Sequence, residues 1–154
     1  DKEGHDLQKH WFIRQLDLAR EMNKPVMIHS REAAADTMEI MKEHGKGIKG
    51  VIHCYSYSLE MAREYVKMGY YIGVGGVVTF KNSKRLKEIV EEIPLESIVL
   101  ETDCPYLAPT PFRGKRNSSL YLPYVVEAIA ELKGISAEQV IEQTEKNARD
   151  LYQL

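Results

Sequence analysis

The sequence has only two cysteines, Cys54 and Cys104, and no apolar run near the roughly 18 residues that a membrane span requires. The cysteines form no CxxC motif, and no apolar, cleavable leader opens the chain. These absences argue against a disulfide-rich secreted domain and an integral membrane protein. We therefore expect a soluble, cytoplasmic protein without a membrane partner.

The sequence also lacks an excess of either charge. It carries 21 Lys and Arg against 23 Asp and Glu, a formal net charge of −2. No global basic field therefore indicates nucleic-acid binding, and such a partner would have to contact a local patch. The 154 residues suffice for one domain with a hydrophobic core, so residues 1–154 are expected to form a single domain.

Hydrophobic periodicity predicts four strands that alternate with helices. The apolar stripe of the first helix consists of Leu7, Trp11, Phe12, Leu16 and Ala19. A loop rich in proline and basic residues follows the fourth strand, and a capping box at Ser136 and Gln139 separates the last two helices. The first strand is predicted to begin at Pro25, and the other three are predicted to cover 50–54, 70–74 and 98–102. The helices are predicted to cover 6–22, 32–44, 58–68, 82–92, about 120–133 and 137–152.

Four such βα units fit either a small open sheet or half of a (β/α)₈ barrel, which typically needs about 250 residues. The chain begins abruptly, with charged residues that run directly into a helix. We therefore expect it to be a piece of a longer protein.

Three of the apolar strands end in residues that can bind a metal, namely His29, His53 and Asp103. Parallel strands bring their carboxyl ends to one rim, where α/β folds place their active sites. Two imidazoles and a carboxylate at such a rim suit a divalent metal that activates water, as in a hydrolase. Strand alternation also places Glu101 on the face of Asp103, either supporting a ligand or forming an ion pair at the barrel bottom.

Longer motifs surround these three residues. They are His29-Ser30-Arg31, His53-Cys54-Tyr55-Ser56, and the stretch from Glu101 to Pro109 (Glu-Thr-Asp-Cys-Pro-Tyr-Leu-Ala-Pro), which Phe112-Arg113-Gly114-Lys115-Arg116-Asn117 continues. In this order and spacing the chain resembles the TatD family of metal-dependent deoxyribonucleases over nearly its whole length. The resemblance implies an α/β fold, the C-terminal half (strands 5–8) of a TIM barrel of the metal-dependent hydrolase type.

The resemblance also implies a two-metal centre, with Mg²⁺, Mn²⁺ or Zn²⁺ as the divalent metal. His29 and His53 would bind one ion, and Asp103 would bind the other and orient or deprotonate the attacking water. The implied activity is 3′–5′ exonucleolytic cleavage of DNA. The family's His-x-His pair and bridging Glu are missing, Tyr57 replaces a common Gly, and Asn117-Ser-Ser lacks the usual Asn-x-Pro.

Substrate contacts are expected from Arg31, Tyr55 and Arg113. Arg31 is predicted at a helix start, where its charge opposes the helix dipole, so it should pair with a carboxylate or a phosphate. Tyr55, Tyr106 and Phe112 either stack on bases or pack in the fold. Lys115 and Arg116 are interpreted as a solvated basic turn. Cys54 and Cys104 follow predicted ligands, so they are expected to be small buried side chains that point away from the metal.

Two other functions remain open. A small-molecule hydrolase of the same barrel class, an amidohydrolase or phosphoesterase, would have a closed apolar pocket in place of the basic rim. A non-catalytic fragment is the other alternative, because the His-x-His and Glu ligands are absent. A half-barrel would also leave two unpaired strand edges, which predicts a homodimer that closes the ring.

Overall fold

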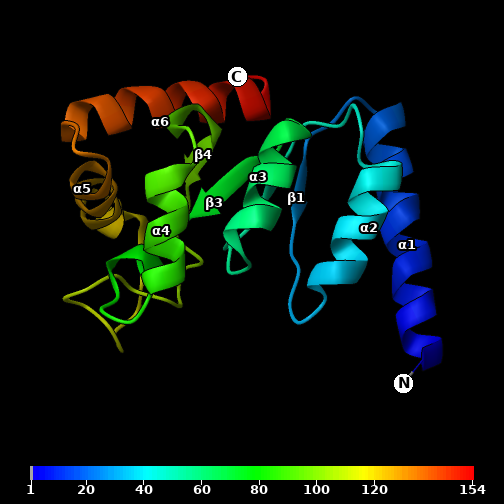
Figure 1. The fold of residues 1–154 in the computed structure, drawn as a ribbon, viewed down its shortest axis with the longest axis horizontal. Helices are drawn as coiled ribbons and strands as arrows, with labels where there is room; N and C mark the ends of the chain where they lie inside the picture. Colours follow the sequence, from blue (N-terminus) through cyan, green and yellow to red (C-terminus); the bar gives the residue numbers. More distant parts are fainter. Residues whose placement is uncertain (1) are drawn as a thin grey trace.

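The computed structural model describes residues 2–154, with side chains from residue 4 on. Its centre is a four-stranded parallel sheet with strand order β1-β2-β3-β4. Each strand is only three or four residues long, and helices lie between consecutive strands (Figure 1). The strands are β1 (Val26–Ile28), β2 (Gly50–Ile52), β3 (Tyr71–Val74) and β4 (Ile98–Leu100).

Helices precede β1, connect successive strands and complete the chain. The α-helices are α1 (Lys2–Glu21), α2 (Ala34–His44), α3 (Leu59–Lys67), α4 (Lys84–Glu92), α5 (Leu122–Lys133) and α6 (Ala137–Tyr152). Short 3₁₀ segments are η1 (Gly76–Thr79), η2 (Leu95–Ser97) and η3 (Ser119–Tyr121). None of the helices in residues 2–154 is long and apolar enough to cross a membrane.

The alternation of side chains along the strands divides the hydrophobic core into two parts. The larger cluster contains an isoleucine from every strand, namely Ile28, Ile52, Ile72 and Ile98, together with apolar residues of the covering helices. The smaller cluster contains Val51, Val99 and Leu151, with Tyr71 packed against it. We call the face of the sheet that carries Val51, Val99 and Tyr71 the inner face. Because Leu151 belongs to α6, this helix packs against the inner face near the strand starts.

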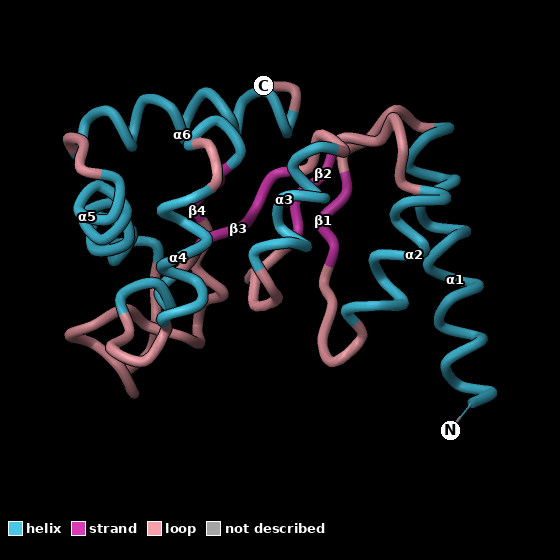
Figure 2. Tube along the Cα trace, viewed as in Figure 1, coloured by secondary structure: helices cyan, strands magenta, loops and turns pink. Residues whose placement is uncertain are grey.

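Polar contacts also hold α6 at this end of the sheet. Asp150 contacts the ammonium of Lys49 at 2.6 Å and accepts a hydrogen bond from the Tyr71 hydroxyl at 2.8 Å. The strands therefore run away from α6, which crosses one end of the molecule, and their carboxyl ends meet at the opposite side (Figure 2).

The order of the predicted elements is confirmed, and the structure has the predicted Ser136–Gln139 capping box at the start of α6. The predicted limits need correction, because the first helix begins at Lys2, β2 ends at Ile52 instead of 54, and β4 ends at Leu100 instead of 102. Leu7 and Trp11 were predicted in the apolar stripe of the first helix, but both side chains are exposed. Leu16, from the same stripe, is buried.

Candidate metal centre

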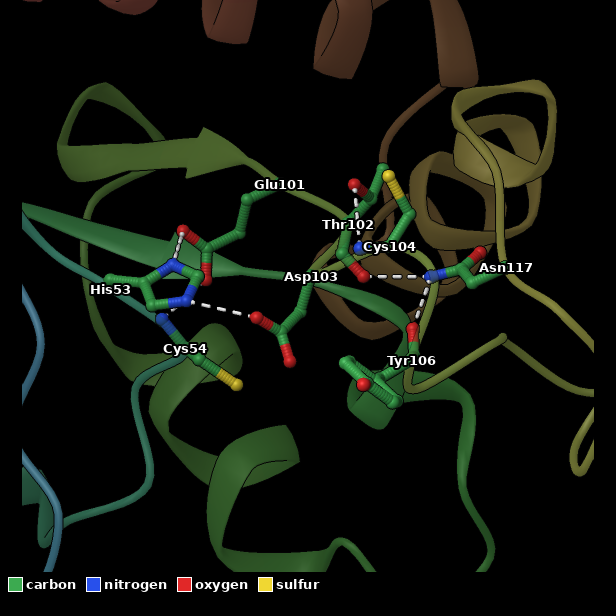
Figure 3. Close-up of polar contacts among 8 residues, drawn as sticks. All are labelled: His53, Cys54, Glu101, Thr102, Asp103, Cys104, Tyr106 and Asn117. Carbon is green, nitrogen blue, oxygen red and sulfur yellow. Dashed lines mark hydrogen bonds and ion pairs between the residues drawn. The ribbon is translucent and has the colours of Figure 1, made fainter.

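His53 follows β2 and is the centre of a cluster of polar side chains. Its Nδ1 lies 2.9 Å from Oε2 of Glu101, and its Nε2 lies 3.2 Å from Oδ1 of Asp103 (Figure 3). The Glu101 side chain is 12% exposed and that of Asp103 is 39% exposed. Glu101 therefore fixes the imidazole from the protein side, and the other ring nitrogen faces the more open side.

Glu101 is held in place by the neighbouring strands. It accepts a hydrogen bond from the backbone N–H of Cys54, directly after His53. Its carboxylate also lies over Gly73 of β3, where an added Cβ would come within 2.6 Å of the Glu101 Cδ. A side chain at position 73 would therefore displace the carboxylate that orients His53.

The half-buried His53 and Glu101 influence each other's protonation. Burial lowers the pKa of His53, but hydrogen bonds and negative charge from Glu101 and Asp103 outweigh burial and raise this pKa above its ordinary value. Burial raises the pKa of the Glu101 carboxyl, against the opposing effect of His53. Both shifts favour retention of a proton by the pair.

Asp103 reaches His53 through a turn, not through the strand. β4 ends at Leu100, and Asp103 has φ +54°, in the left-handed region that non-glycine residues rarely adopt. The prediction that strand alternation puts Asp103 beside Glu101 was therefore wrong in its reason. Both carboxylates nevertheless contact the same imidazole.

His29 lies beside this cluster without joining its hydrogen bonds to Glu101 and Asp103. It follows β1, its side chain is exposed, and its ring centroid lies 5.9 Å from that of His53. Among the described residues, no group of three His, Cys, Asp or Glu side chains is arranged to hold a metal ion. The three predicted ligands are thus neighbours, with His53 and Asp103 in contact with each other.

The types of donor in this cluster, imidazole and carboxylate, suit a divalent metal, whereas the side chains do not surround an ion. Histidine ligands in metal sites commonly donate their second ring N–H to a carboxylate, which fixes the tautomer and the ring orientation. Glu101 has this relation to His53, and it leaves Nε2 directed toward Asp103. The imidazole of His29 supplies another nitrogen close to the same place.

The three residues predicted to contact substrate differ in exposure to solvent. Tyr55 is only 3% exposed and its hydroxyl donates to the carbonyl of Ser58, so of the two alternatives for this ring the structure has packing, and the expected substrate contact needs correction. Arg31 is exposed, but α2 begins only at Ala34, so the argument from the helix dipole does not apply. Arg113 is also exposed, and its guanidinium lies 4.0 Å from the ring centroid of Phe80.

The two cysteines are not catalytic candidates. Cys104 is exposed, contrary to the prediction of a buried side chain, and its thiol points away from His53 (Figure 3). Cys54 is half-buried. Burial, together with the charges of Glu101 and Asp103, raises the pKa of its thiol to about 11, which disfavours the nucleophilic thiolate.

Two further contributors were not recognised in the sequence. Gly73 of β3 makes space for the Glu101 carboxylate. Asn117 was noted only as part of a motif, yet its buried amide contacts the loop that carries Asp103 (Figure 3). The sequence offers one signal for Asn117, namely an asparagine that directly follows a run of basic loop residues. The role of Gly73 could be recognised only from the register of β3 with β4.

Comparison with known proteins gives the family. The profile of the TatD related DNase family matches residues 1–153 of the chain. The chain belongs to this family. It is 48% identical over 155 residues to the uncharacterized metal-dependent hydrolase YabD of Bacillus subtilis, covering 100% of this chain and 61% of YabD. It is 35% identical to the 3′-5′ ssDNA/RNA exonuclease TatD of Pantoea vagans, covering 98% of this chain and 60% of that protein.

Solved structures of TatD proteins share the fold. The crystal structure of YJJV, a TatD homolog from Escherichia coli, superposes with a TM-score of 0.85 at 30% identity, covering 91% of this chain and 54% of YJJV. A TatD family hydrolase from Entamoeba histolytica gives a TM-score of 0.78 at 22% identity, covering 89% of this chain and 54% of that protein. The predicted fold class, a partial TIM-barrel-type α/β fold, is thereby confirmed. The chain spans about 60% of the length of YabD and of the Pantoea protein.

Proposed function

We propose that this TatD protein is a metal-dependent hydrolase that cleaves phosphodiester bonds of DNA from the 3′ end. The observation that carries the proposal is the imidazole of His53, which Glu101 fixes on one side and which faces Asp103 on the other. The printed name of the Pantoea relative, a 3′-5′ ssDNA/RNA exonuclease, supports a single-stranded nucleic acid as the substrate.

In this proposal His29 and His53 would hold one divalent ion and Asp103 the other, at the two-metal site of the intact family, with Mg²⁺, Mn²⁺ or Zn²⁺ as the metal. The bound metal supplies positive charge that activates water and stabilises the phosphoryl group. Asp103 orients the attacking water and accepts its proton, which suits a half-exposed carboxylate at the open side of the cluster. Glu101 keeps the His53 ring in its orientation through Nδ1.

A groove beside the Asp103 loop is the proposed path of the substrate. Tyr106 is 71% exposed, so its ring is free to stack on a base, whereas the ring of Tyr55 is buried and has no role in substrate binding here. Arg113 provides a guanidinium for phosphate, and Arg31 provides another beside His29. The groove is lined by Phe80, Pro105, Tyr106, Leu107, Ala108, Arg113, Gly114, Lys115 and Arg116.

We also propose that residues 1–154 form a single partial barrel domain and that two copies pair through the open edges of their half-barrels. Among the described strands, β1 pairs only with β2, and β4 pairs only with β3. The outer edges of both strands are thus available to a second copy of the chain, and such pairing would add a second set of metal ligands to the ring.

Nucleotide release from 3′-labelled single-stranded DNA tests the activity. We expect release with Mg²⁺ or Mn²⁺, none with EDTA, and a loss of at least about a hundredfold in His53→Ala. His10→Ala is the matched control, because His10 lies on the exposed surface of α1 and should leave the rate unchanged. Equal release by the wild type and His53→Ala would contradict the proposal, as would metal-independent cleavage.

A further inference from the structure

The side chain of Asn117 connects two ends of the loop that carries Asp103. Asn117 is only 4% exposed although a loop of exposed basic residues precedes it. Its amide nitrogen donates one hydrogen bond to the carbonyl of Thr102 at 2.7 Å and another to the carbonyl of Tyr106 at 2.8 Å (Figure 3). These two carbonyls lie on either side of the segment from Asp103 to Pro105.

Backbone contacts complete the same clamp. The backbone N–H of Asn117 donates to the carbonyl of Pro105 at 2.9 Å, and the N–H of Tyr106 donates to the carbonyl of Asp103 at 2.9 Å. The amide oxygen of Asn117 accepts the N–H of Ser118 at 2.8 Å. All donors and the acceptor of this buried amide are thus used, and two of its three side-chain contacts constrain the Asp103 loop.

This loop needs an external constraint because Asp103 has left-handed backbone geometry at φ +54°. A non-glycine residue keeps such a conformation only where surrounding contacts compensate for it. The Asp103 carboxylate reaches His53 from this turn, at 3.2 Å from Nε2. Relaxation of the turn would therefore move Asp103 away from His53 even though neither residue had been changed.

We infer that Asn117 is a positioning residue that holds Asp103 toward His53. The inference rests on the proposed metal centre, which it deepens. An asparagine suits this position because its amide offers two N–H donors to two carbonyls and one acceptor to a backbone N–H. Aspartate has the same shape but no donor when ionised, and it would place negative charge against both carbonyl oxygens.

The chain offers a matched control at the opposite end of the same strand. Asn147 of α6 is 3% exposed, and its amide nitrogen also donates to two carbonyls, those of Leu95 at 2.8 Å and Ile98 at 2.7 Å. Asn117 and Asn147 thus match in residue type, burial and number of carbonyls bound. They differ in place, because Asn147 lies at the start of β4 and Asn117 beyond its end.

The test compares Asn117→Asp with Asn147→Asp, with wild type and Asp103→Asn as references. Free Mn²⁺ is titrated by electron paramagnetic resonance without substrate, and thermal unfolding is followed by circular dichroism. We expect both Asn variants to lose thermal stability. Asn117→Asp should bind Mn²⁺ about tenfold more weakly or worse, as expected when a group that orients a ligand is removed, and Asn147→Asp should bind within about twofold of wild type.

Asn117→Ser keeps one donor, so it should give an intermediate loss of affinity and serves where the aspartate variant does not fold. The inference is overturned if Asn117 variants bind Mn²⁺ like wild type, or if both Asn sites lose affinity in proportion to their stability. If Asp103→Asn binds Mn²⁺ as wild type does, the proposed metal centre itself fails, and the role of Asn117 fails with it. Weak binding by Asp103→Asn with normal binding by Asn117→Ser and Asn117→Asp rejects the positioning role alone.

Discussion

At the scale of single residues, Gly73 shows how a residue without a side chain determines where a neighbouring carboxylate lies. The backbone of Gly73 in β3 pairs with Val99 of β4, two residues before Glu101. The Glu101 carboxylate fills the space that a Cβ at position 73 would occupy, and this carboxylate holds Nδ1 of His53. The absence of one methyl group in β3 thus determines the orientation of an imidazole after β2.

Gly73→Ala should therefore impair both the fold and the metal centre. Overpacking typically costs about 1–3 kcal/mol of unfolding free energy, and the displaced Glu101 would release His53. Gly50→Ala is the matched control, because its Cβ would also come within 2.7 Å of neighbouring side chains, those of Tyr70 and Val26, but at the start of β2. Urea unfolding and Mn²⁺ titration should show that both variants are destabilised and that only Gly73→Ala binds Mn²⁺ more weakly. Equal Mn²⁺ binding by the two variants would contradict this role.

Residue patterns alone select the three proposed metal ligands. His29, His53 and Asp103 could be selected because each follows an apolar strand, and parallel strands end at one rim. Local sequence could not show the left-handed turn at Asp103, which depends on hydrogen bonds from Asn117, fourteen positions further along the chain. It also could not show that Tyr55 is buried, since its burial follows from packing against Tyr57 and Tyr65.

At the scale of elements, α6 stabilises the sheet from the end opposite the proposed metal centre. Its capping box begins the helix at Ser136, and near its end Asp150 contacts Lys49 and Tyr71. The capping box was predictable because its residues are local in the sequence. The contacts of Asp150 were not, because they join positions about a hundred and about eighty residues apart.

The contacts of Asp150 should make this attachment sensitive to acid. Hydrogen bonds from Lys49 and Tyr71 lower the pKa of Asp150 below 3.8. A lowered pKa in the folded state means that the carboxylate stabilises the fold above pH 3.8 and that this stabilisation is lost as pH falls through the folded-state pKa. Asp150→Asn should therefore reduce the free energy of unfolding at pH 7 by the amount expected of an exposed pair, about 0–1 kcal/mol, and lower the melting temperature slightly.

Thermal unfolding of wild type and Asp150→Asn across acidic and neutral pH measures this difference. The two melting curves should converge as pH falls below 3.8, because protonated aspartic acid no longer pairs with Lys49. Asp36→Asn is the control for loss of an exposed ion pair elsewhere, since Asp36 contacts Lys9 between α2 and α1. A difference that persists unchanged in acid would show that Asp150 acts through packing and not through its charge.

At the scale of the whole molecule, the order of elements was predictable and the strand limits were not. Periodicity of apolar residues identifies amphipathic helices well, but here each strand has only three or four residues. The residues after these strands remain close to the sheet while their backbones turn, as φ +47° at Cys54 shows. Local propensity does not distinguish such a turn from a longer strand.

The same short sheet leaves an apolar region beside its first strand. Leu18 of α1, Met22 in the turn after α1 and Met27 of β1 are exposed, and all three line one groove. Met27 lies on the inner face of β1, next to Val51 of β2, which is buried. An unpaired strand edge flanked by apolar side chains is a favourable place for another strand to pair, which supports the proposed pairing with a second copy.

Light scattering after gel filtration can test this pairing over a range of concentrations. We expect wild type to approach twice its 17.7 kDa mass as concentration rises. Met27→Lys should shift the mass toward 17.7 kDa, because a lysine at a strand edge opposes pairing with another strand. Ile141→Lys is the matched control, since Ile141 is an exposed apolar residue on α6 and its replacement should leave the mass unchanged. A wild-type mass of 17.7 kDa at every concentration would refute the pairing, because closure of the half-barrel by a second copy requires the dimer.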